Sequence, residues 1–246
     1  MNDSDLIFGT RPVIEAIKAG KQIEKIFIKK DLQGEVFHQL NELIKAEKLP
    51  YQIVPIEKLN RLTRKNHQGV VAMISPVIYQ SVESMLPGWY EEGLVPLVVI
   101  LDRITDVRNM GAIVRSAECA GVNAIVFPAR GSAQINADAV KTSAGALSRI
   151  PVEKSQSLGK TIRFLKDSGL QVIACTEKSS TNYTSFDYKK PTAILMGSEE
   201  DGISEGLLNM CDHQAAIPLM GEIGSLNVSV AAGVILYEAV RQRLSM

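Results

Sequence analysis

The hydrophobic positions near the start of the chain switch between helical and strand spacing. Val13, Ile14 and Ile17 have the spacing of one helix face, and Ile23 to Ile28 alternates apolar with polar residues as a half-buried strand does. The same patterns then predict, in order, a helix near 36–44, a strand at 52–54, a short helix at 56–62 and a strand at 69–74. This alternation predicts a small α/β domain over residues 1–76.

A second region opens with the continuous apolar run Pro96 to Leu101, which is typical of a central parallel strand. Further strands are expected at 124–127, 171–175, 192–196 and 215–219, and helices at 109–120, 137–147, 157–168 and 227–243. Strands and helices therefore alternate again, which predicts a doubly wound parallel sheet over residues 94–246. In such a sheet the functional loops leave the carboxyl ends of the strands.

Residues 77–93 separate these two regions in both pattern and charge. They lack a sustained period and contain Pro87-Gly88, a dipeptide that favours turns, so we interpret them as a linker. They carry three acidic and no basic side chains, whereas residues 1–76 carry 12 basic and 9 acidic ones. The amino-terminal domain is therefore mildly basic, although the whole chain, with 27 of each, has no net charge.

Composition and missing motifs narrow the function. The 246 residues are 46% hydrophobic and 22% charged, the longest apolar stretch is far shorter than a membrane helix, and the polar start shows no signal peptide. Three well-separated cysteines favour a reducing, cytoplasmic location. There is no dinucleotide fingerprint, P-loop or nucleophile elbow, and the three histidines lack the spacing of metal ligands. Dehydrogenase, kinase, hydrolase and metalloenzyme functions are therefore disfavoured.

Three polar segments, each placed after a predicted strand, are the candidates for chemistry. In the first, a polar loop enters a helix at Asn109, a good amino-terminal cap, and Arg115 follows. A capped helix with a solvated arginine would explain this segment equally well. In the second, Gly197 and Gly202 bracket an acidic loop where the backbone can approach a ligand closely. A plain acidic turn is the alternative for this loop.

The third segment is the most informative. Ser225, Asn227 and Ser229 alternate with Leu226 and Val228 at the start of a long apolar helix. A capping serine explains Ser225, but it does not explain two more polar residues so near the start of the helix. This cluster indicates a bound ligand, with a structural hydrogen-bond network as the alternative.

In this order and spacing, the three segments resemble the motifs of the SpoU family of RNA 2′-O-ribose methyltransferases. The matching positions are Asn109-x-Gly111-x-x-x-Arg115, Met196-Gly197-Ser198-Glu199-x-x-Gly202, and Ile217-Pro218 with Ser225-Leu226-Asn227-Val228-Ser229-x-Ala231. Residues 9–17 and 66–72 resemble the family's small amino-terminal substrate-binding domain. Residues 132–136 resemble the RlmB-like branch, which methylates a guanosine of 23S ribosomal RNA. One departure is Val107, where the family usually has proline.

The resemblance implies a fold, a cofactor and partners. The fold would be an α/β domain of the SPOUT type, with a parallel sheet and a carboxyl-terminal trefoil knot, preceded by the small α/β substrate-binding domain. S-adenosylmethionine would be the methyl donor, no metal would be needed, and two copies would form a homodimer whose active sites borrow from both chains. By position, the backbone around five residues would hold the cofactor: Thr176, Gly197, Ile217, Leu219 and Leu226.

The same resemblance implies catalytic and RNA-binding residues. Arg115 is expected to bind the substrate phosphate and to stabilise the developing alkoxide, since a guanidinium stays protonated at neutral pH and is a poor base. The residues expected to orient Arg115, the ribose and the cofactor are Asn109, Glu199, Ser225 and Asn227. RNA contacts are expected from Arg61, Arg64, Lys65 and His67, with Arg108 and Lys141 extending the surface. On the residues alone, a solvated helix end would explain the basic cluster at 61–67.

Several substrates stay open within this family. The expected activity is methylation of a guanosine ribose in 23S ribosomal RNA, and the nearest alternative is a tRNA ribose methyltransferase. Against the tRNA enzyme, the chain has the amino-terminal domain and stops soon after Arg243 without a basic extension. A non-catalytic RNA-binding relative is disfavoured by the intact motif residues. Methylation that confers antibiotic resistance is a further alternative.

Overall fold

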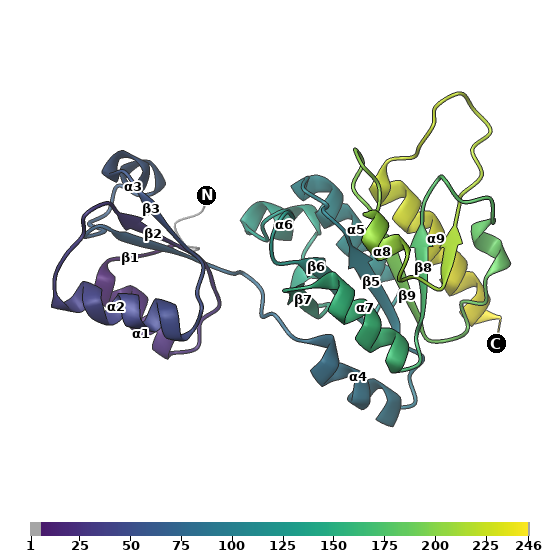
Figure 1. Ribbon diagram of the computed structural model, residues 1–246, viewed down its shortest axis with the longest axis horizontal. Helices are drawn as coiled ribbons and strands as arrows, with labels where there is room; N and C mark the ends of the chain where they lie inside the picture. Colours follow the sequence, from purple (N-terminus) through teal and green to yellow (C-terminus); the bar gives the residue numbers. More distant parts are fainter. Residues whose placement is uncertain (1–5, 246) are drawn as a thin grey trace. The chain divides into compact units, whose positions relative to one another are not determined.

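The computed structural model describes residues 6–245, and the chain divides into two compact units, residues 1–78 and 79–246. Each unit forms its own sheet around its own buried core (Figure 1). No helix among the described residues is long and apolar enough to cross a membrane.

The first unit is a four-stranded sheet in the order β1-β4-β2-β3, in which β4 runs antiparallel to β1 and β2 while β2 and β3 are parallel. Its strands are β1 (Leu6–Phe8), β2 (Ile23–Lys29), β3 (Tyr51–Val54) and β4 (Val70–Ile74). Helices α1 (Thr10–Lys18) and α2 (Glu35–Ala46) pack on one face, and the shorter α3 (Ile56–Leu62) packs on the other. The helices and strands predicted here are confirmed; β1 escapes prediction because three residues carry too little pattern.

Residues 77–93 are not a simple linker. Ser81 caps helix α4 (Val82–Glu91) with its side-chain oxygen, and Leu86 of this helix is buried in the core of the second unit. The linker interpretation is therefore wrong for most of the segment. The sequence did not predict this helix because it contains Pro87. A proline inside a helix removes a backbone hydrogen bond, so it usually marks the end of a helix.

The second unit is built on six parallel strands in the order β10-β8-β9-β5-β6-β7, which confirms the predicted parallel sheet. The strands are β5 (Leu97–Leu101), β6 (Ala124–Pro128), β7 (Val152–Ser155), β8 (Gln171–Cys175), β9 (Thr192–Met196) and β10 (His213–Ala215). After β5, the chain adds β6 and β7 on one side of this strand. The later strands β8, β9 and β10 lie on the other side, with β9 next to β5. The strand order therefore switches beside β5, where ligands of such sheets usually bind at the carboxyl ends.

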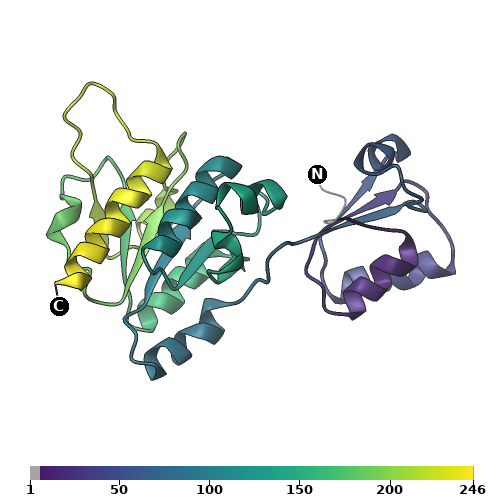
Figure 2. The ribbon, with the colours of Figure 1, turned by 180° about the vertical axis from the view of Figure 1, so that it is seen from behind.

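Helices cover both faces of this sheet. One face carries α4, α7 (Leu158–Asp167) and α8 (Glu205–Leu208). The other carries α5 (Val107–Cys119), α6 (Ala137–Thr142) and α9 (Val228–Leu244), and Figure 2 shows α5 and α9 side by side. This arrangement agrees with the doubly wound architecture expected from the sequence.

Two element boundaries differ from the prediction. The helix expected at 137–147 ends early, because Ala144 and Gly145 adopt left-handed backbone conformations with φ of 51° and 85°. A short 3-10 turn follows. The strand expected at 215–219 instead ends at Ala215, so residues 216–227 form a long loop that leads to α9.

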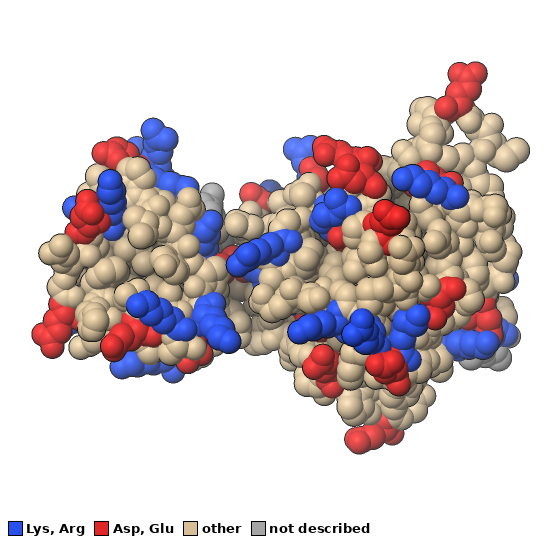
Figure 3. Space-filling model, in the orientation of Figure 1, with Lys and Arg blue, Asp and Glu red and all other residues tan. Residues whose placement is uncertain are grey.

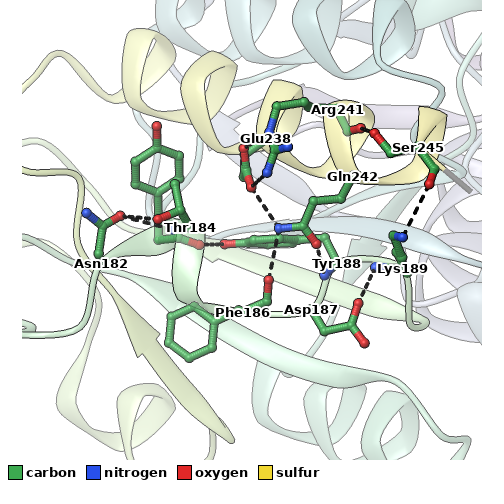
Figure 4. Close-up of polar contacts among 11 residues, drawn as sticks. Asn182, Thr184, Phe186, Asp187, Tyr188, Lys189, Glu238, Arg241, Gln242 and Ser245 are labelled. Atoms are coloured by element: carbon green, nitrogen blue, oxygen red, sulfur yellow. Dashed lines mark hydrogen bonds and ion pairs between the residues drawn. The ribbon is translucent and has the colours of Figure 1, made fainter.

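The end of α9 is bound to the segment between β8 and β9 by side-chain hydrogen bonds (Figure 4). Gln242 donates to the carbonyl of Phe186 at 3.0 Å and accepts from the N–H of Tyr188 at 2.9 Å. Arg243 donates to four backbone carbonyls, which are those of Val95, Pro96, Tyr188 and Lys190. These bonds fix the helix against the segments that lead into β5 and β9.

Candidate functional site

Asn227 joins three segments that are far apart in the sequence. Its side-chain Nδ2 donates to Oδ1 of Asn109, at 3.0 Å, and to Oε1 of Glu199, at 2.5 Å. Asn109 lies at the start of α5, which follows β5, and Glu199 lies in the loop after β9, the strand beside β5. The three polar segments singled out in the sequence therefore meet at the carboxyl edge of the sheet. We call these three residues the Asn227 junction.

The helix caps differ from those expected. Oδ1 of Asp106 accepts from the backbone N–H groups of Arg108 and Asn109, at 2.7 and 2.9 Å, so Asp106 caps α5 and the expectation for Asn109 is wrong. The side chain of Asn109 instead accepts from Asn227. Asn227 caps α9, because its Oδ1 accepts from the N–H of Ser229 at 3.0 Å. Ser225, two residues earlier in the chain, is not the cap.

Gly197 and Gly202 shape the loop that carries Glu199. Ser198 and Gly202 exchange two backbone hydrogen bonds, of 3.1 and 3.0 Å, which close the loop. A Cβ added to Gly197 would lie 2.2 Å from the carbonyl carbon of Gly202, so only glycine fits there. The loop is therefore held in one compact shape.

Gly111 has a different role in the first motif. A Cβ added there would lie 2.7 Å from Cβ of Thr142, so the glycine lets α5 pack closely on α6. This contact helps to fix the helix that begins beside Asn109. The glycine in the motif thus supports the position of the junction without touching it.

A cavity of about 350 Å³ lies beside the junction. Its wall includes all five residues expected around the cofactor, which are Thr176, Gly197, Ile217, Leu219 and Leu226. Glu199 and Ser225 also line it, as do the apolar side chains of Val228 and Ile235. A second hollow, of about 320 Å³, is lined by Glu199 and Asn109. Glu199 therefore borders both spaces.

Cys175 is another residue of the cavity wall. Burial raises the pKa of its thiol far above the ordinary value, and the neighbouring Cys211 raises it further. The thiol therefore stays protonated at neutral pH and does not serve as a nucleophile. Among residues 6–245, no group of three or more His, Cys, Asp or Glu side chains is placed to hold a metal ion.

Arg115 does not reach the junction within one chain. It is exposed on α5, and among the described residues no hydrogen bond or ion pair links it to Glu199, Ser225 or Asn227. It lies six positions after Asn109, which places it ~9 Å further along the helix and on a different side. Of the five expected catalytic residues, Glu199 and Ser225 thus line the cavity, and Asn109 and Asn227 are joined to Glu199 in the junction. Arg115 lies apart from them.

His67 has a structural role. It is only 8% exposed, its Nε2 bonds to Oδ1 of Asn60 at 2.9 Å, and its Nδ1 accepts from the N–H of Gly69 at 3.0 Å. Both ring nitrogens are therefore used to hold the loop that leads into β4. The expectation that this histidine contacts RNA is wrong, because no polar atom of its ring is left for a ligand.

The other residues expected to bind RNA are exposed, and Figure 3 shows lysine and arginine side chains on the surface of both units. The expected residues are Arg61, Arg64 and Lys65 in the first unit and Arg108 and Lys141 in the second. The amine of Lys65 lies 5.0 Å from the ring centre of Phe8. Sequence reasoning missed Lys25 and Lys58, whose amines lie 5.5 and 5.3 Å from the ring centre of Phe27. The sequence could have predicted that Lys25 lies beside Phe27, since the two residues are two positions apart on one strand and share a face.

Comparison with known proteins identifies the family. Residues 96–237 match the model of the SpoU rRNA methylase family. The chain belongs to this family. Residues 6–80 of the SpoU chain match a second model, described as RNA 2′-O ribose methyltransferase substrate binding. Relatives from Staphylococcus haemolyticus and Staphylococcus aureus, each named a TrmH family tRNA/rRNA methyltransferase, are 35% identical to it over 97% and 98% of this chain and 96% and 97% of their own.

Solved structures resemble both units of the SpoU chain. The SpoU methyltransferase AviRb of Streptomyces viridochromogenes, in complex with AdoMet, has a TM-score of 0.63 and 25% identity over 98% of this chain and 91% of its own. An AdoMet-bound rRNA methyltransferase of Sinorhizobium meliloti has a TM-score of 0.61 and 28% identity over 96% and 86%. A TrmH/SpoU tRNA modifying enzyme of A. aeolicus has a TM-score of 0.57 and 34% identity, but covers 67% of this chain and 85% of its own.

Proposed function

We propose that this SpoU enzyme transfers a methyl group from S-adenosylmethionine to the ribose 2′-hydroxyl of a guanosine in 23S ribosomal RNA. RNA methylation is the activity of its family, and S-adenosylmethionine is the donor. The observation that supports transfer to a ribose hydroxyl is the Asn227 junction beside the 350 Å³ cavity. The junction places amide and carboxylate groups next to a space for the cofactor, where a sugar hydroxyl can be oriented.

The cavity fits S-adenosylmethionine in size and chemistry. Its volume is that of a small-molecule site, and its apolar wall at Ile217 and Leu226 suits an adenine ring. The backbone at Gly197, where no side chain fits, can approach the ligand closely, and backbone groups near Thr176 and Leu219 complete the wall. Carboxylates around the cavity favour a positive sulfonium. When bound, the cofactor supplies a methyl carbon that is electrophilic because the sulfur is charged.

The protein contributes mainly by positioning the reacting groups. Methyl transfer requires the hydroxyl oxygen, the methyl carbon and the sulfur to be in line, and holding them so lowers the barrier. We assign this orientation to four residues: Asn109, Glu199, Ser225 and Asn227. Because a guanidinium stays protonated at neutral pH, Arg115 binds the adjacent phosphate and stabilises the developing alkoxide, while phosphate or solvent takes the proton.

Arg115 completes the site of a second copy, in our proposal, because it lies outside the junction of its own chain. The helix beside it, α9, has three large exposed apolar side chains, which are Val230 at 52%, Tyr237 at 54% and Leu244 at 82%. Exposed apolar groups of this size favour burial between copies, which supports a homodimer. We also propose that α9 takes part in a trefoil knot. The hydrogen bonds of Gln242 to the segment between β8 and β9 support this.

Mixing two inactive variants tests the dimer. Arg115→Ala and Asn227→Asp should each abolish turnover, and Arg115→Ala should retain cofactor binding. If Arg115 acts across the dimer, each mixed dimer contains one complete site of two. Because about half of the dimers in an equimolar co-refolded mixture are mixed, the mixture should regain about one quarter of wild-type activity. No recovery in mixed dimers, verified by differently tagged chains, would place Arg115 in its own site.

The first unit, we propose, binds RNA with the face of its sheet that α3 covers. Along β2, Ile26 and Ile28 are buried under α1 and α2, whereas Phe27 is buried on the α3 side. The amines of Lys25 and Lys58 lie over the ring of Phe27 on that side, and Lys65 lies over Phe8. These lysines are partly ordered before RNA arrives, which reduces the entropy that phosphate binding costs.

Salt dependence tests this surface. Replacing Lys25 and Lys58 by alanine should reduce the slope of log Kd against log salt by about 1.5, because two phosphate contacts are lost. The matched control is the pair Lys18 and Lys45, which end α1 and α2 on the other face and should leave the slope unchanged. Equal effects of the two pairs would argue for diffuse charge attraction and against a defined face.

Ribosomal RNA is favoured over tRNA by the extent of the matches. The rRNA methyltransferase of Sinorhizobium meliloti covers 96% of this chain, whereas the tRNA modifying enzyme covers 67%, too little for both units in full.

The decisive experiment incubates the purified protein with labelled S-adenosylmethionine and separate 23S, 16S and transfer RNA. The expected result is label in 23S RNA on the ribose of a guanosine, recovered in an alkali-resistant dinucleotide. Label in tRNA alone, or on a base, would overturn the proposal.

A further inference from the structure

Arg103 has an unusual backbone conformation directly after β5. Its φ is 59°, in the left-handed region that glycine adopts at little cost and that a long side chain adopts only with strain. Four other non-glycine residues of the described chain share this feature, so the conformation alone assigns no role. The contacts of the side chain distinguish Arg103 from them.

The guanidinium of Arg103 links β5 to the loop that carries Glu199. Its Nη1 lies 3.0 Å from Oδ2 of Asp201, its Nη2 donates to the carbonyl of Gly202 at 3.2 Å, and its Nε lies 3.3 Å from Oδ1 of Asp102. Asp102 is only 4% exposed, and its Oδ2 accepts from the N–H of Ser204 at 2.8 Å. The Asp102–Arg103 pair therefore holds the loop at several points between 201 and 204.

This loop determines where Glu199 lies. Residues 198–202 line the 350 Å³ cavity, and 198–201 also line the 320 Å³ hollow, whose wall includes Arg103 itself. Glu199 is exposed, and its side chain makes one hydrogen bond, to Asn227, among the described residues. Its position therefore depends on the backbone that Arg103 holds. A shift of this backbone would therefore move Glu199 relative to Asn227 and change the shape of the cavity.

We propose that Arg103 is a positioning residue for methyl transfer, which fixes the loop 198–202 and so places Glu199 beside the cofactor. This inference rests on the proposed function of the site. The strained backbone supports it, because glycine would fit the turn without strain but would remove the contacts that Arg103 makes with Asp201 and Gly202 of the loop. The arginine side chain thus offsets a conformational cost that a purely structural turn would avoid.

Three variants separate positioning from stability. Arg103→Met keeps the strained backbone and loses the contacts, Arg103→Gly relieves the strain and also loses them, and Arg103→Lys keeps a charge near Asp201. We expect Arg103→Gly to melt at a higher temperature than Arg103→Met, yet to match its loss of function. For both, Kd for S-adenosylmethionine should rise about tenfold and kcat should fall about 10- to 100-fold. Arg103→Lys should recover part of both.

Two further measurements complete the test. Asp201→Asn should reproduce part of the loss and should add little to Arg103→Met, because both remove the same contact. Arg149→Met is the control, since Arg149 is 76% exposed and lies 3.9 Å from Glu118, away from the cavity wall. It should leave Kd and kcat unchanged.

The outcomes distinguish this inference from the proposed function. Two results would overturn the positioning role and leave the proposed function intact. One is an Arg103→Gly variant with wild-type Kd and kcat. The other is a loss of binding and turnover that follows the melting temperature across all three variants. Wild-type protein that neither binds S-adenosylmethionine nor methylates ribose would instead overturn the proposed function.

Discussion

Asn227→Asp tests whether one side chain both caps α9 and assembles the junction. Aspartate caps helices as well as asparagine does, so its Oδ1 should still accept from the N–H of Ser229. The substitution removes the Nδ2 donor, however, and places a second carboxylate at the oxygen of Glu199 that Nδ2 now approaches within 2.5 Å. The variant therefore separates the cap from the junction.

The size of the effect follows from these contacts. A hydrogen bond to a charged group contributes about 1.5–3 kcal/mol, and the lower end applies because both side chains are exposed. Two carboxylates about 3.5 Å apart repel each other by about 1 kcal/mol when water screens them. The variant should therefore lose about 2–3 kcal/mol of unfolding free energy at pH 7.5. For a domain of this size, that loss lowers Tm by roughly 4–12 °C.

Calorimetric melting between pH 4 and pH 7.5 measures this loss and its cause. Protonation of the carboxyl that the substitution introduces removes the repulsion, so the Tm difference from wild type should shrink as the pH falls toward about 4. Asn182→Asp is the matched control: Asn182 caps a helical turn through the N–H of Thr184, and no hydrogen bond of its amide to a carboxylate occurs among the described residues. An Asn227→Asp variant that melts like wild type at every pH would refute the junction.

Three further substitutions test other parts of the structure. Gly197→Ala should weaken S-adenosylmethionine binding at least ~10-fold by calorimetry, because the new Cβ displaces the backbone of Gly202; Gly206→Ala, where a Cβ meets nothing within 4 Å, should not. Hydrogen bonding from Arg241 lowers the pKa of Glu238 (Figure 4), so the stability that the charged carboxylate adds is present above the ordinary pKa of glutamate and is lost as the pH falls through the lowered pKa. Glu238→Gln should therefore melt below wild type at pH 7, and the difference in Tm should shrink as the pH falls below that ordinary pKa. Arg243→Met should lower Tm by roughly 4–12 °C, since its hydrogen bonds to four carbonyls contribute about 2–3 kcal/mol.

The parallel sheet was predictable because its central strands are nearly all apolar. Residues 97–101 and 192–196 are buried on both faces, so their patterns are continuous and hard to mistake. That prediction also located the site, because parallel strands place the loops after β5 and β9 at one edge. The elements that escaped prediction lack such a signal. β7 reads Val-Glu-Lys-Ser, and α4 contains a Pro-Gly pair.

The partners of polar side chains were harder to predict than the strands. Asp106 and Asn109 are equally suited to cap a helix, and only the path of the backbone decides that Asp106 does so. His67 lies among basic residues, yet the backbone turn at Gly69 buries it and uses both ring nitrogens. Arg103 follows a strand like any surface residue, and the loop residues that it contacts, Asp201 and Gly202, lie 98 and 99 residues away in the chain.

The polar cluster at the start of α9 now has a physical explanation. Capping needs only an acceptor, which serine, threonine or aspartate also provides, but the junction needs donors aimed at Asn109 and Glu199. Asparagine supplies both the acceptor and the donors from one planar amide. Its oxygen accepts from the first turn of the helix, and its nitrogen donates to the two other segments. Formation of α9 therefore orients the nitrogen, and the site is assembled only when the last helix is in place. Variants that loosen the distant end of α9, such as Arg243→Met, should for this reason weaken catalysis without touching the cavity.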